Sequence, residues 1–264
     1  GWSGGKDRED VHLLGYYNFI RAADGYLRPR DSYAEVALMF PRQAIYAGDG
    51  GFLEPFRRLA RGIIERHILF DVLIDQKMTA EALSRYAVVV VPETRYLTGE
   101  QNRMLDGYVA AGGAVVVLPA TGRPKEGLPA LTDRSGRRIF WGDVEDKKAV
   151  AQAVSEAGGQ RLSRFTAPPT VQVHADRQRG HNRILVHLVN YNRDEEQQAS
   201  EAPIAAEPIS ADLRLPARAR VARIRFLTPE VEGERNLEFS QTEGCVRFTT
   251  PSFLVYGLAV IEWQ

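Results

Sequence analysis

The hydrophobic period of this 264-residue chain changes once, close to Gly158 and Gly159, and that change restricts the fold more than any other feature. Upstream of it, apolar runs of strand length alternate with segments whose apolar residues recur at helical spacing. Downstream of Pro168 and Pro169 the helical spacing disappears, and short strand-like runs follow one another. The sequence therefore predicts an α/β fold followed by an all-β fold. A TIM barrel is excluded, because its eight βα units cannot be found.

Two segments of the first part, 87–91 and 114–118, are apolar at every position. A strand with one face in solvent alternates in polarity, so uninterrupted apolar runs are typical of parallel strands covered on both faces. We expect a doubly wound, mainly parallel sheet of about five strands with helices on both faces. Its other strands are predicted at 34–40, 70–74 and 138–141, and its helices at 52–67, 79–86, 98–111 and 145–157.

In the second part, strand-like runs separated by turn residues predict an antiparallel β-sandwich of about seven strands. The clearest alternation places Arg223 and Arg225 on one strand face, which we interpret as solvated, with an anion or partner site as the alternative. Cys245 lies in another strand and is expected to be a buried, unreactive thiol, with a reactive thiol as the alternative. The predicted strands are 171–174, 184–191, 209–215, 221–227, 237–240, 245–249 and 253–263.

These patterns divide the chain into a lead-in or linker segment, 1–33, an α/β domain, 34–160, and a β-sandwich domain, 161–264. The lead-in contains an amphipathic helix at 11–23, which the following Asp-Gly pair is expected to end. The chain begins without methionine, which processing, a residual tag or excision from a longer protein would explain.

The composition excludes several classes of function. Equal numbers of basic and acidic residues, 34 of each, argue against a nucleic-acid-binding surface. A single cysteine rules out an internal disulfide and a cysteine-ligated zinc site, and the histidines lack helical metal-site spacing, so we expect no metal. No phosphate-binding motif is found, and no cofactor is expected. The absence of a bilayer-length apolar run and of a signal peptide favours a cytoplasmic protein without a membrane partner.

The strongest catalytic candidates are two carboxylates, Glu93 and Asp49. Glu93 follows the predicted central strand 87–91, and Asp49 lies in the glycine-rich loop 48–51. Open α/β sheets bind ligands at the carboxyl ends of their strands, where an acid–base pair of these two groups would form. The interpretation we favour is that Glu93 caps a helix or forms an ion pair and that Asp49 makes a turn. No nucleophile elbow with Ser or Cys follows any strand.

Aromatic side chains are the second kind of candidate. Trp2, Tyr16, Tyr17 and Tyr26 cluster near the N-terminus, and Trp141 lies in the last predicted strand of the α/β part. Aromatic rings stack on sugar faces, but they also anchor protein interfaces. For the N-terminal group we favour packing at an interface, with sugar binding as the alternative.

Several stretches carry a resemblance to a known family. They are LGYYNFIRAADGYLRPRDSYAEVALMFPRQAIYAGDG at 14–50, FDVLID at 70–75 and YAVVVVPETRYLTGEQNRMLDGYVAAGGAVVVLP at 86–119. Together they resemble the second domain of family 42 β-galactosidases. The stretches RILVHLVNYN at 183–192 and FLVYGLAVIEW at 253–263 resemble the all-β domain that ends such chains.

The resemblance implies a flavodoxin-like or class I amidotransferase-like α/β domain that has lost amidotransferase chemistry and is associated with trimerisation. In that family a TIM barrel carries both catalytic carboxyls, and this chain has no barrel, so no catalytic residue is carried over. Pro92, Glu93 and Thr94 occupy the region where an amidotransferase needs its nucleophilic cysteine.

The leading hypothesis is a non-catalytic C-terminal region of a glycoside hydrolase that forms a homo-oligomer, with a trimer favoured. Two alternatives stay open: a small hydrolase that uses Glu93 at the sheet edge, and a carbohydrate-binding module. The sequence names no substrate.

Overall fold

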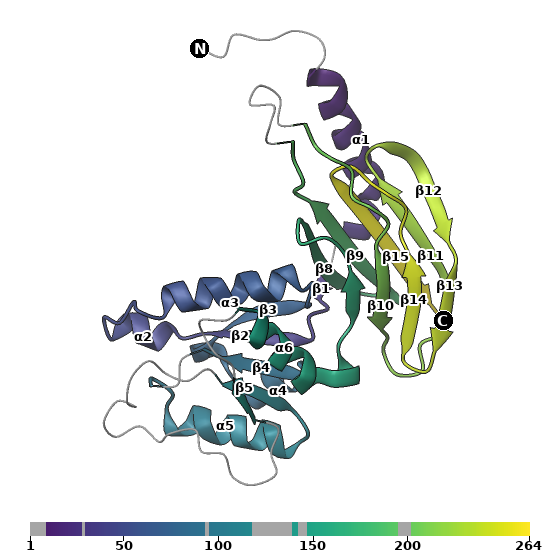
Figure 1. Cartoon of the computed structure of the whole chain (residues 1–264). Coiled ribbons are helices and arrows are strands. Elements are labelled where there is room, and N and C mark those ends of the chain that lie inside the picture. The colour runs from purple at the N-terminus through teal and green to yellow at the C-terminus, as the bar shows by residue number, and fades with distance from the viewer. Residues whose placement is uncertain (1–8, 28–29, 93–94, 118–138, 142–146, 195–201) are drawn as a thin grey trace, which may run out of the picture. The chain divides into compact units, whose positions relative to one another are not determined.

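The computed structural model describes residues 9–27, 30–92, 95–117, 139–141, 147–194 and 202–264 (Figure 1). The chain divides into two compact units. The α/β unit is Ala34–Arg164, and the β unit consists of Gly1–Tyr33 together with Phe165–Gln264. The lead-in segment therefore belongs to the same unit as the C-terminal strands. Among the described residues, no helix is long and apolar enough to cross a membrane.

A parallel sheet forms the centre of the α/β unit, as the sequence predicts. All side chains of its strands β4 and β5 are buried, because both faces of the sheet are covered. Across the sheet the strand order is β3 (Phe70–Ile74), β2 (Val36–Phe40), β4 (Val88–Val91), β5 (Ala114–Val117) and β6 (Ile139–Trp141).

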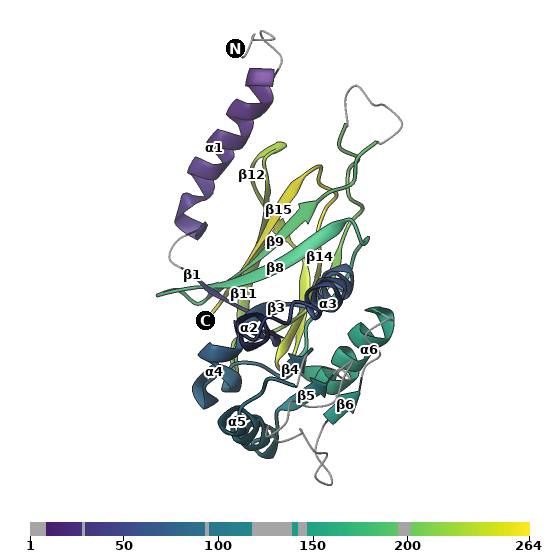
Figure 2. The same ribbon diagram turned by 90° about the vertical axis from the view of Figure 1, so that its left-hand side faces the viewer.

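Helices cover both faces of this sheet (Figure 2). Successive residues of β2 point to opposite faces, so Leu38 shares one core cluster with Ile63 of α3, and Met39 shares the other with Leu105 of α5. The α/β unit therefore has two apolar cores separated by the sheet. Its described helices are α2 (Arg42–Tyr46), α3 (Leu53–Glu65), α4 (Ala80–Ser84), α5 (Gly99–Ala110) and α6 (Lys147–Gly158), with the 3-10 turns η1 (Asp75–Lys77) and η2 (Gly159–Arg161).

The start of α5 shows how the sequence sets a helix boundary. Thr98 Oγ1 accepts a hydrogen bond from the amide of Gln101 at 3.2 Å, and Gln101 Oε1 accepts one from the amide of Thr98 at 2.9 Å. This reciprocal capping box satisfies two amide groups that lack partners within the helix. The prediction that a helix begins at Thr98 is confirmed.

Two antiparallel sheets form the centre of the β unit, as predicted for this half of the chain. The six-stranded sheet has the order β1-β8-β9-β15-β11-β12, and the four-stranded sheet has the order β13-β14-β10-β7. The strands are β1 (Arg30–Ser32), β7 (Arg164–Thr166), β8 (Val171–Gln178), β9 (Arg183–Asn190), β10 (Ser210–Arg214), β11 (Val221–Thr228), β12 (Val231–Leu237), β13 (Phe239–Thr242), β14 (Cys245–Thr249) and β15 (Tyr256–Trp263).

Helix α1 (Glu9–Leu27) packs on the six-stranded sheet, where Phe19 meets the ring of Tyr256 edge to face at 5.6 Å. The expectation that an Asp-Gly pair ends this helix near residue 23 is wrong, because α1 continues to Leu27. The carbonyl of Gly25 accepts a hydrogen bond from Gln178 of β8 at 2.6 Å, which supports the extra turn from outside the helix. Tertiary contact thus overrides a local stop signal.

Four short or exposed elements, β1, α2, β7 and β12, were not predicted. Strand β12 is exposed on both faces at nearly every position. Its sequence therefore lacks the alternation of apolar and polar residues that identifies a half-buried strand. Strands β1 and β7 have three residues each, too few to show a period. They form because they pair with longer neighbouring strands, β1 with β8 and β7 with β10.

Candidate functional site

Three loops lie at the carboxyl edge of the parallel sheet, where open α/β sheets bind their ligands. They follow β2, β3 and β4 and contain Asp49, Asp75 and the neighbours Arg95 and Tyr96. Glu93 also belongs to the loop after β4, but it lies outside the described residues. Its pairing with Asp49 stays a prediction.

The carboxylate of Asp49 is fully engaged by its neighbours. It accepts hydrogen bonds from the Tyr96 hydroxyl at 2.8 Å and from the Gly51 amide at 2.9 Å, and Arg95 Nη2 lies 3.0 Å away. The hydrogen bond from Tyr96 lowers the pKa of the Asp49 carboxyl, and the Gly51 amide and Arg95 lower it further. A carboxyl held ionised in this way is a poor proton donor, and the Gly51 contact is one that a turn residue makes.

Asp75 is a buried carboxylate that was not predicted as a site residue. It accepts hydrogen bonds from the amides of Gln43 at 2.9 Å and Gln76 at 2.7 Å, and its carbonyl accepts one from Gln101 Nε2 at 3.0 Å. Asp75 therefore joins the end of β3 to α2 and α5. Its position as the first residue after a predicted strand is the signal that could have identified it.

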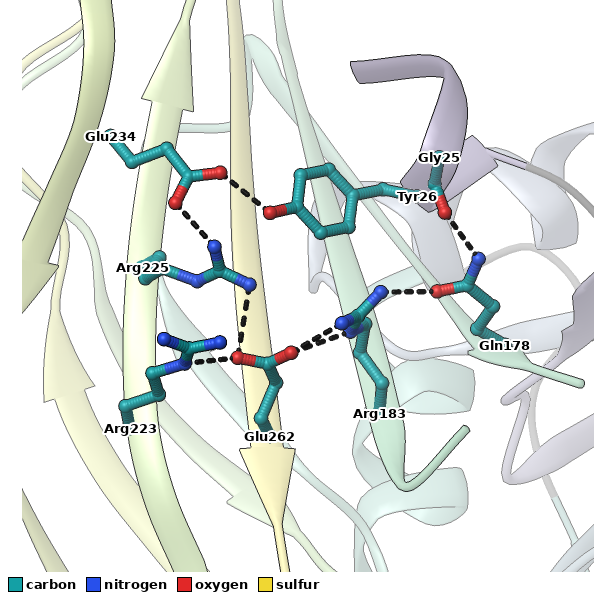
Figure 3. Close-up of polar contacts among 8 residues, drawn as sticks. All are labelled: Gly25, Tyr26, Gln178, Arg183, Arg223, Arg225, Glu234 and Glu262. Carbon is teal, nitrogen blue, oxygen red and sulfur yellow. Dashed lines mark hydrogen bonds and ion pairs between the residues drawn. The ribbon is translucent and has the colours of Figure 1, made fainter. Parts of the chain in front are cut away.

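A second polar site lies where the last turn of α1 meets the six-stranded sheet (Figure 3). The ring of Tyr26 contacts two guanidinium groups, with its centroid 4.9 Å from that of Arg183 and 5.2 Å from that of Arg225. Its hydroxyl donates a hydrogen bond to Glu234 at 2.5 Å. Cation–π contact and a charge-assisted hydrogen bond together hold this end of the helix on the sheet.

Glu262 of β15 lies at the centre of this site (Figure 3). Arg183 Nε and Arg225 Nη2 each donate to its carboxylate at 2.9 Å, and Arg223 pairs with the same group. Burial opposes ionisation, yet hydrogen bonds from Arg223 and Arg183 lower the pKa of the Glu262 carboxyl to about 2. The predicted solvated face is wrong for Arg225, whose side chain is only 11% exposed because the Tyr26 ring covers it.

A third polar cluster surrounds Asp176, a buried residue of β8. Its carboxylate lies 3.2 Å from Arg30 Nε, 3.3 Å from His187 Nε2 and 3.1 Å from His174 Nε2. Burial raises the pKa of Asp176, but the contacts with the histidines and Arg30 hold it well below its usual range. In the part of the chain that the structure describes, no group of three or more His, Cys, Asp or Glu residues is arranged to hold a metal ion.

The aromatic candidates for sugar binding do not form a common platform among the described side chains. Tyr16 is half-buried and donates a hydrogen bond to Glu230 at 3.3 Å, whereas Tyr17 is 62% exposed. Nothing is described of the side chains of Trp2 and Trp141. Sugar binding by these residues stays a prediction.

A hollow of about 610 Å³ lies beside α4 and α5 and is lined in part by Tyr86 and Tyr108. Both hydroxyls are already bonded: that of Tyr108 to the carbonyl of Tyr86, and that of Tyr86 to Asp71, each at 3.0 Å. Burial raises the pKa of both phenols to about 12. Neither hydroxyl is therefore suited to acid–base chemistry near neutral pH.

No protein-family model matches the chain, and no curated protein matches its sequence. The fold is similar to that of α-L-fucosidase isoenzyme 2 from Paenibacillus thiaminolyticus, with a TM-score of 0.74 and 17% identity over 99% of this chain and 53% of that chain. It is also similar to a catalytic mutant of a GH42 β-galactosidase from G. stearothermophilus, with a TM-score of 0.51 and 13% identity over 90% and 41% of the two chains.

A third similar structure is the rhamnosidase from Novosphingobium sp. PP1Y, with a TM-score of 0.56 and 14% identity over 94% of this chain and 24% of that chain. At such identities the likeness shows the fold alone. The chain spans about half the length of the fucosidase and less of the other two. These neighbours are glycoside hydrolases, and the chain has a fold related to part of each.

Proposed function

We propose that this chain is a non-catalytic accessory region of a glycoside hydrolase. In this proposal the α/β unit is a flavodoxin-like domain that mediates self-association, as a trimer, and the β unit is an accessory β-sandwich. The observation that carries the proposal is that 99% of the chain matches about half of a longer fucosidase at a TM-score of 0.74.

The strand order supports the flavodoxin-like assignment. Numbered within the α/β unit alone, β3-β2-β4-β5-β6 corresponds to the order 2-1-3-4-5, the order found in flavodoxin. Folds with this order bind ligands where the order reverses, between the first and third strands of the sheet. Here the loops after those two strands, β2 and β4, supply Asp49, Arg95 and Tyr96, which bind one another. The charge of the Asp49 carboxylate is already paired with Arg95, which is consistent with a domain that carries no catalysis.

Two measurements on the chain test the proposal. We expect no turnover of aryl fucosides, galactosides or rhamnosides, and a mass of three copies by light scattering coupled to size-exclusion chromatography. A monomeric mass over the whole accessible concentration range would contradict self-association. Turnover that is lost in Glu93→Gln and weakened in Asp49→Asn would favour the small-hydrolase alternative instead.

A further inference from the structure

The first and last residues of the α/β unit are joined by a direct polar contact. The unit begins at Ala34 and ends at Arg164, so Glu35 lies just inside its entry and Ser163 just inside its exit. The Glu35 carboxylate accepts a hydrogen bond from the Ser163 amide at 2.6 Å and another from the Ser163 hydroxyl at 2.7 Å. Two hydrogen bonds to one charged group therefore connect positions that are 128 residues apart.

The main chain of Glu35 is fixed in the parallel sheet. Its amide donates a hydrogen bond to the carbonyl of Leu69 at 3.0 Å, and its carbonyl accepts one from the amide of Ala87 at 2.7 Å. Leu69 directly precedes β3 and Ala87 directly precedes β4, so Glu35 is held at the amino edge of three neighbouring strands. This is the edge opposite to the loops that contain Asp49 and Asp75.

Residues 159–163, which we call the closing strap, lead from the end of α6 to the Glu35 carboxylate. Leu162 of the strap is buried in the core cluster that α6 shares with the sheet. It packs against Gly158, where a Cβ atom would lie 2.3 Å from the leucine side chain. Arg161 donates a hydrogen bond to a carbonyl in the turn before β5, that of Gly112, at 2.9 Å. The strap therefore covers one apolar core of the α/β unit.

The last residue of the strap is held by its polar groups. Ser163 is only 5% exposed, and a buried amide or hydroxyl costs free energy unless it finds an acceptor. The Glu35 carboxylate accepts from both groups. Without that carboxylate the two donors would lose this acceptor, and lifting the strap would bring them into water. Of the strap residues only Leu162 and Ser163 are buried, so little apolar surface resists such a local opening.

We propose that the Glu35–Ser163 pair is a latch that fastens the closing strap, and that the strap opens as a local unit when this pair breaks. The strap is the last segment of the α/β unit before the chain passes into the β unit. The latch therefore also holds the entry and the exit of the α/β unit beside each other. This inference goes beyond the proposed function and does not depend on self-association.

Hydrogen-exchange mass spectrometry of the full chain tests the latch. Glu35→Ala removes the acceptor of both hydrogen bonds, and we expect it to speed amide exchange in the closing strap at least about tenfold. Ser163→Ala removes only the hydroxyl bond and should have a smaller effect of the same sign. Exchange in β9 and β15 should change less than about twofold. Glu54→Ala is the matched control, because the Glu54 side chain is 64% exposed and pairs only within its own helix, with Arg57.

A double variant shows whether the two residues act together. Adding Ser163→Ala to Glu35→Ala should speed exchange in the strap no further, because the pair is already broken. Strap exchange in Glu35→Ala that matches the parent chain would overturn the inference, and so would an equal rise in β4 and β5, which would mean a general loss of stability. If circular dichroism shows that Glu35→Ala does not fold, Ser163→Ala decides, and unchanged strap exchange in that variant refutes the latch.

Discussion

The hydroxyl of Tyr26 donates a hydrogen bond of 2.5 Å to Glu234 and so joins the last turn of α1 to the end strand of the six-stranded sheet. The two residues lie 208 positions apart in the sequence. Burial raises the pKa of the Tyr26 phenol, while the bonds from Tyr26 and Arg225 keep the pKa of Glu234 low in spite of partial burial. The pair therefore remains a neutral donor and a charged acceptor near neutral pH.

Replacing Tyr26 should separate the hydrogen bond from the ring contacts. We expect Tyr26→Phe to lower the free energy of unfolding of the β unit by about 1.5–3 kcal/mol, the range for a hydrogen bond to a charged group. Tyr26→Ala should cost more, because both cation–π contacts and the packing of the half-buried ring are also lost. Urea unfolding followed by circular dichroism measures both. Tyr17→Phe is the control, since Tyr17 is 62% exposed, and an equal loss there would contradict the interpretation.

The site around Glu262 predicts an acid-sensitive β unit. The pKa of the Glu262 carboxyl is about 2 in the folded chain against 4.5 for an unperturbed glutamate side chain, so folding favours the ionised form. The contribution of Glu262 to the free energy of unfolding is fully present above a pH of about 4.5 and is lost as the pH falls toward about 2. Glu262→Gln should lower the stability at pH 7 and flatten its dependence on pH within that interval. Unfolding free energies measured across the interval check this, and an unchanged pH profile in the variant would refute it.

The two sheet types were predictable because each has its own apolar period. The valine run of β4 has no polar position, which only a strand buried on both faces tolerates, and the capping pair Thr98 and Gln101 marks the start of α5 locally. The end of α1 was not predictable, because the hydrogen bond that supports Gly25 comes from Gln178, 153 residues later. Local signals determine a boundary only where no distant partner competes with them.

The polar sites were predicted less well than the fold. Asp49 was identified from its loop, but its partners Arg95 and Tyr96 come from another loop and were not assigned to it. Arg225 looked solvated because strand alternation shows which face a side chain is on, but does not show that a helix from the N-terminus covers that face. A polar network is defined by pairs of residues, and a single sequence shows each residue separately.

Two glycines close together in sequence should respond in opposite ways to alanine. A Cβ atom on Gly113 would lie 2.3 Å from the ring of Tyr108, a buried residue, whereas a Cβ on Gly107 meets nothing within 4 Å. We expect Gly113→Ala to destabilise the α/β unit by roughly 1–3 kcal/mol through overpacking. Gly107→Ala, inside α5, should stabilise it by roughly 0.5–1 kcal/mol. Thermal unfolding of both variants tests this, and a shift of the same sign in both would contradict it.

The thiol of Cys245 should be nearly inert in the folded chain. It is buried on β14, as the sequence predicts, and burial together with the neighbouring Asp212 carboxylate raises its pKa to about 11 from the 9.0 of an unperturbed cysteine. Because the thiolate is the reactive form and its population at pH 8 falls as the pKa rises, we expect a reaction slower by at least about tenfold at pH 8, and limited access slows it further. The release of thionitrobenzoate from Ellman's reagent measures this rate in the native chain and in guanidinium chloride.

The variant Asp212→Asn separates the two causes of that inertness. It removes the carboxylate that opposes the thiolate but leaves Cys245 buried, so we expect a rate between those of the native and unfolded chains. A native thiol that reacts as fast as the unfolded one would mean that β14 opens readily, since burial is the larger cause of the raised pKa. If Cys245 of folded Asp212→Asn reacted more slowly than Cys245 of the folded parent chain, the contribution of the Asp212 charge to the raised pKa would be contradicted. Removing a neighbouring negative charge can only favour the thiolate.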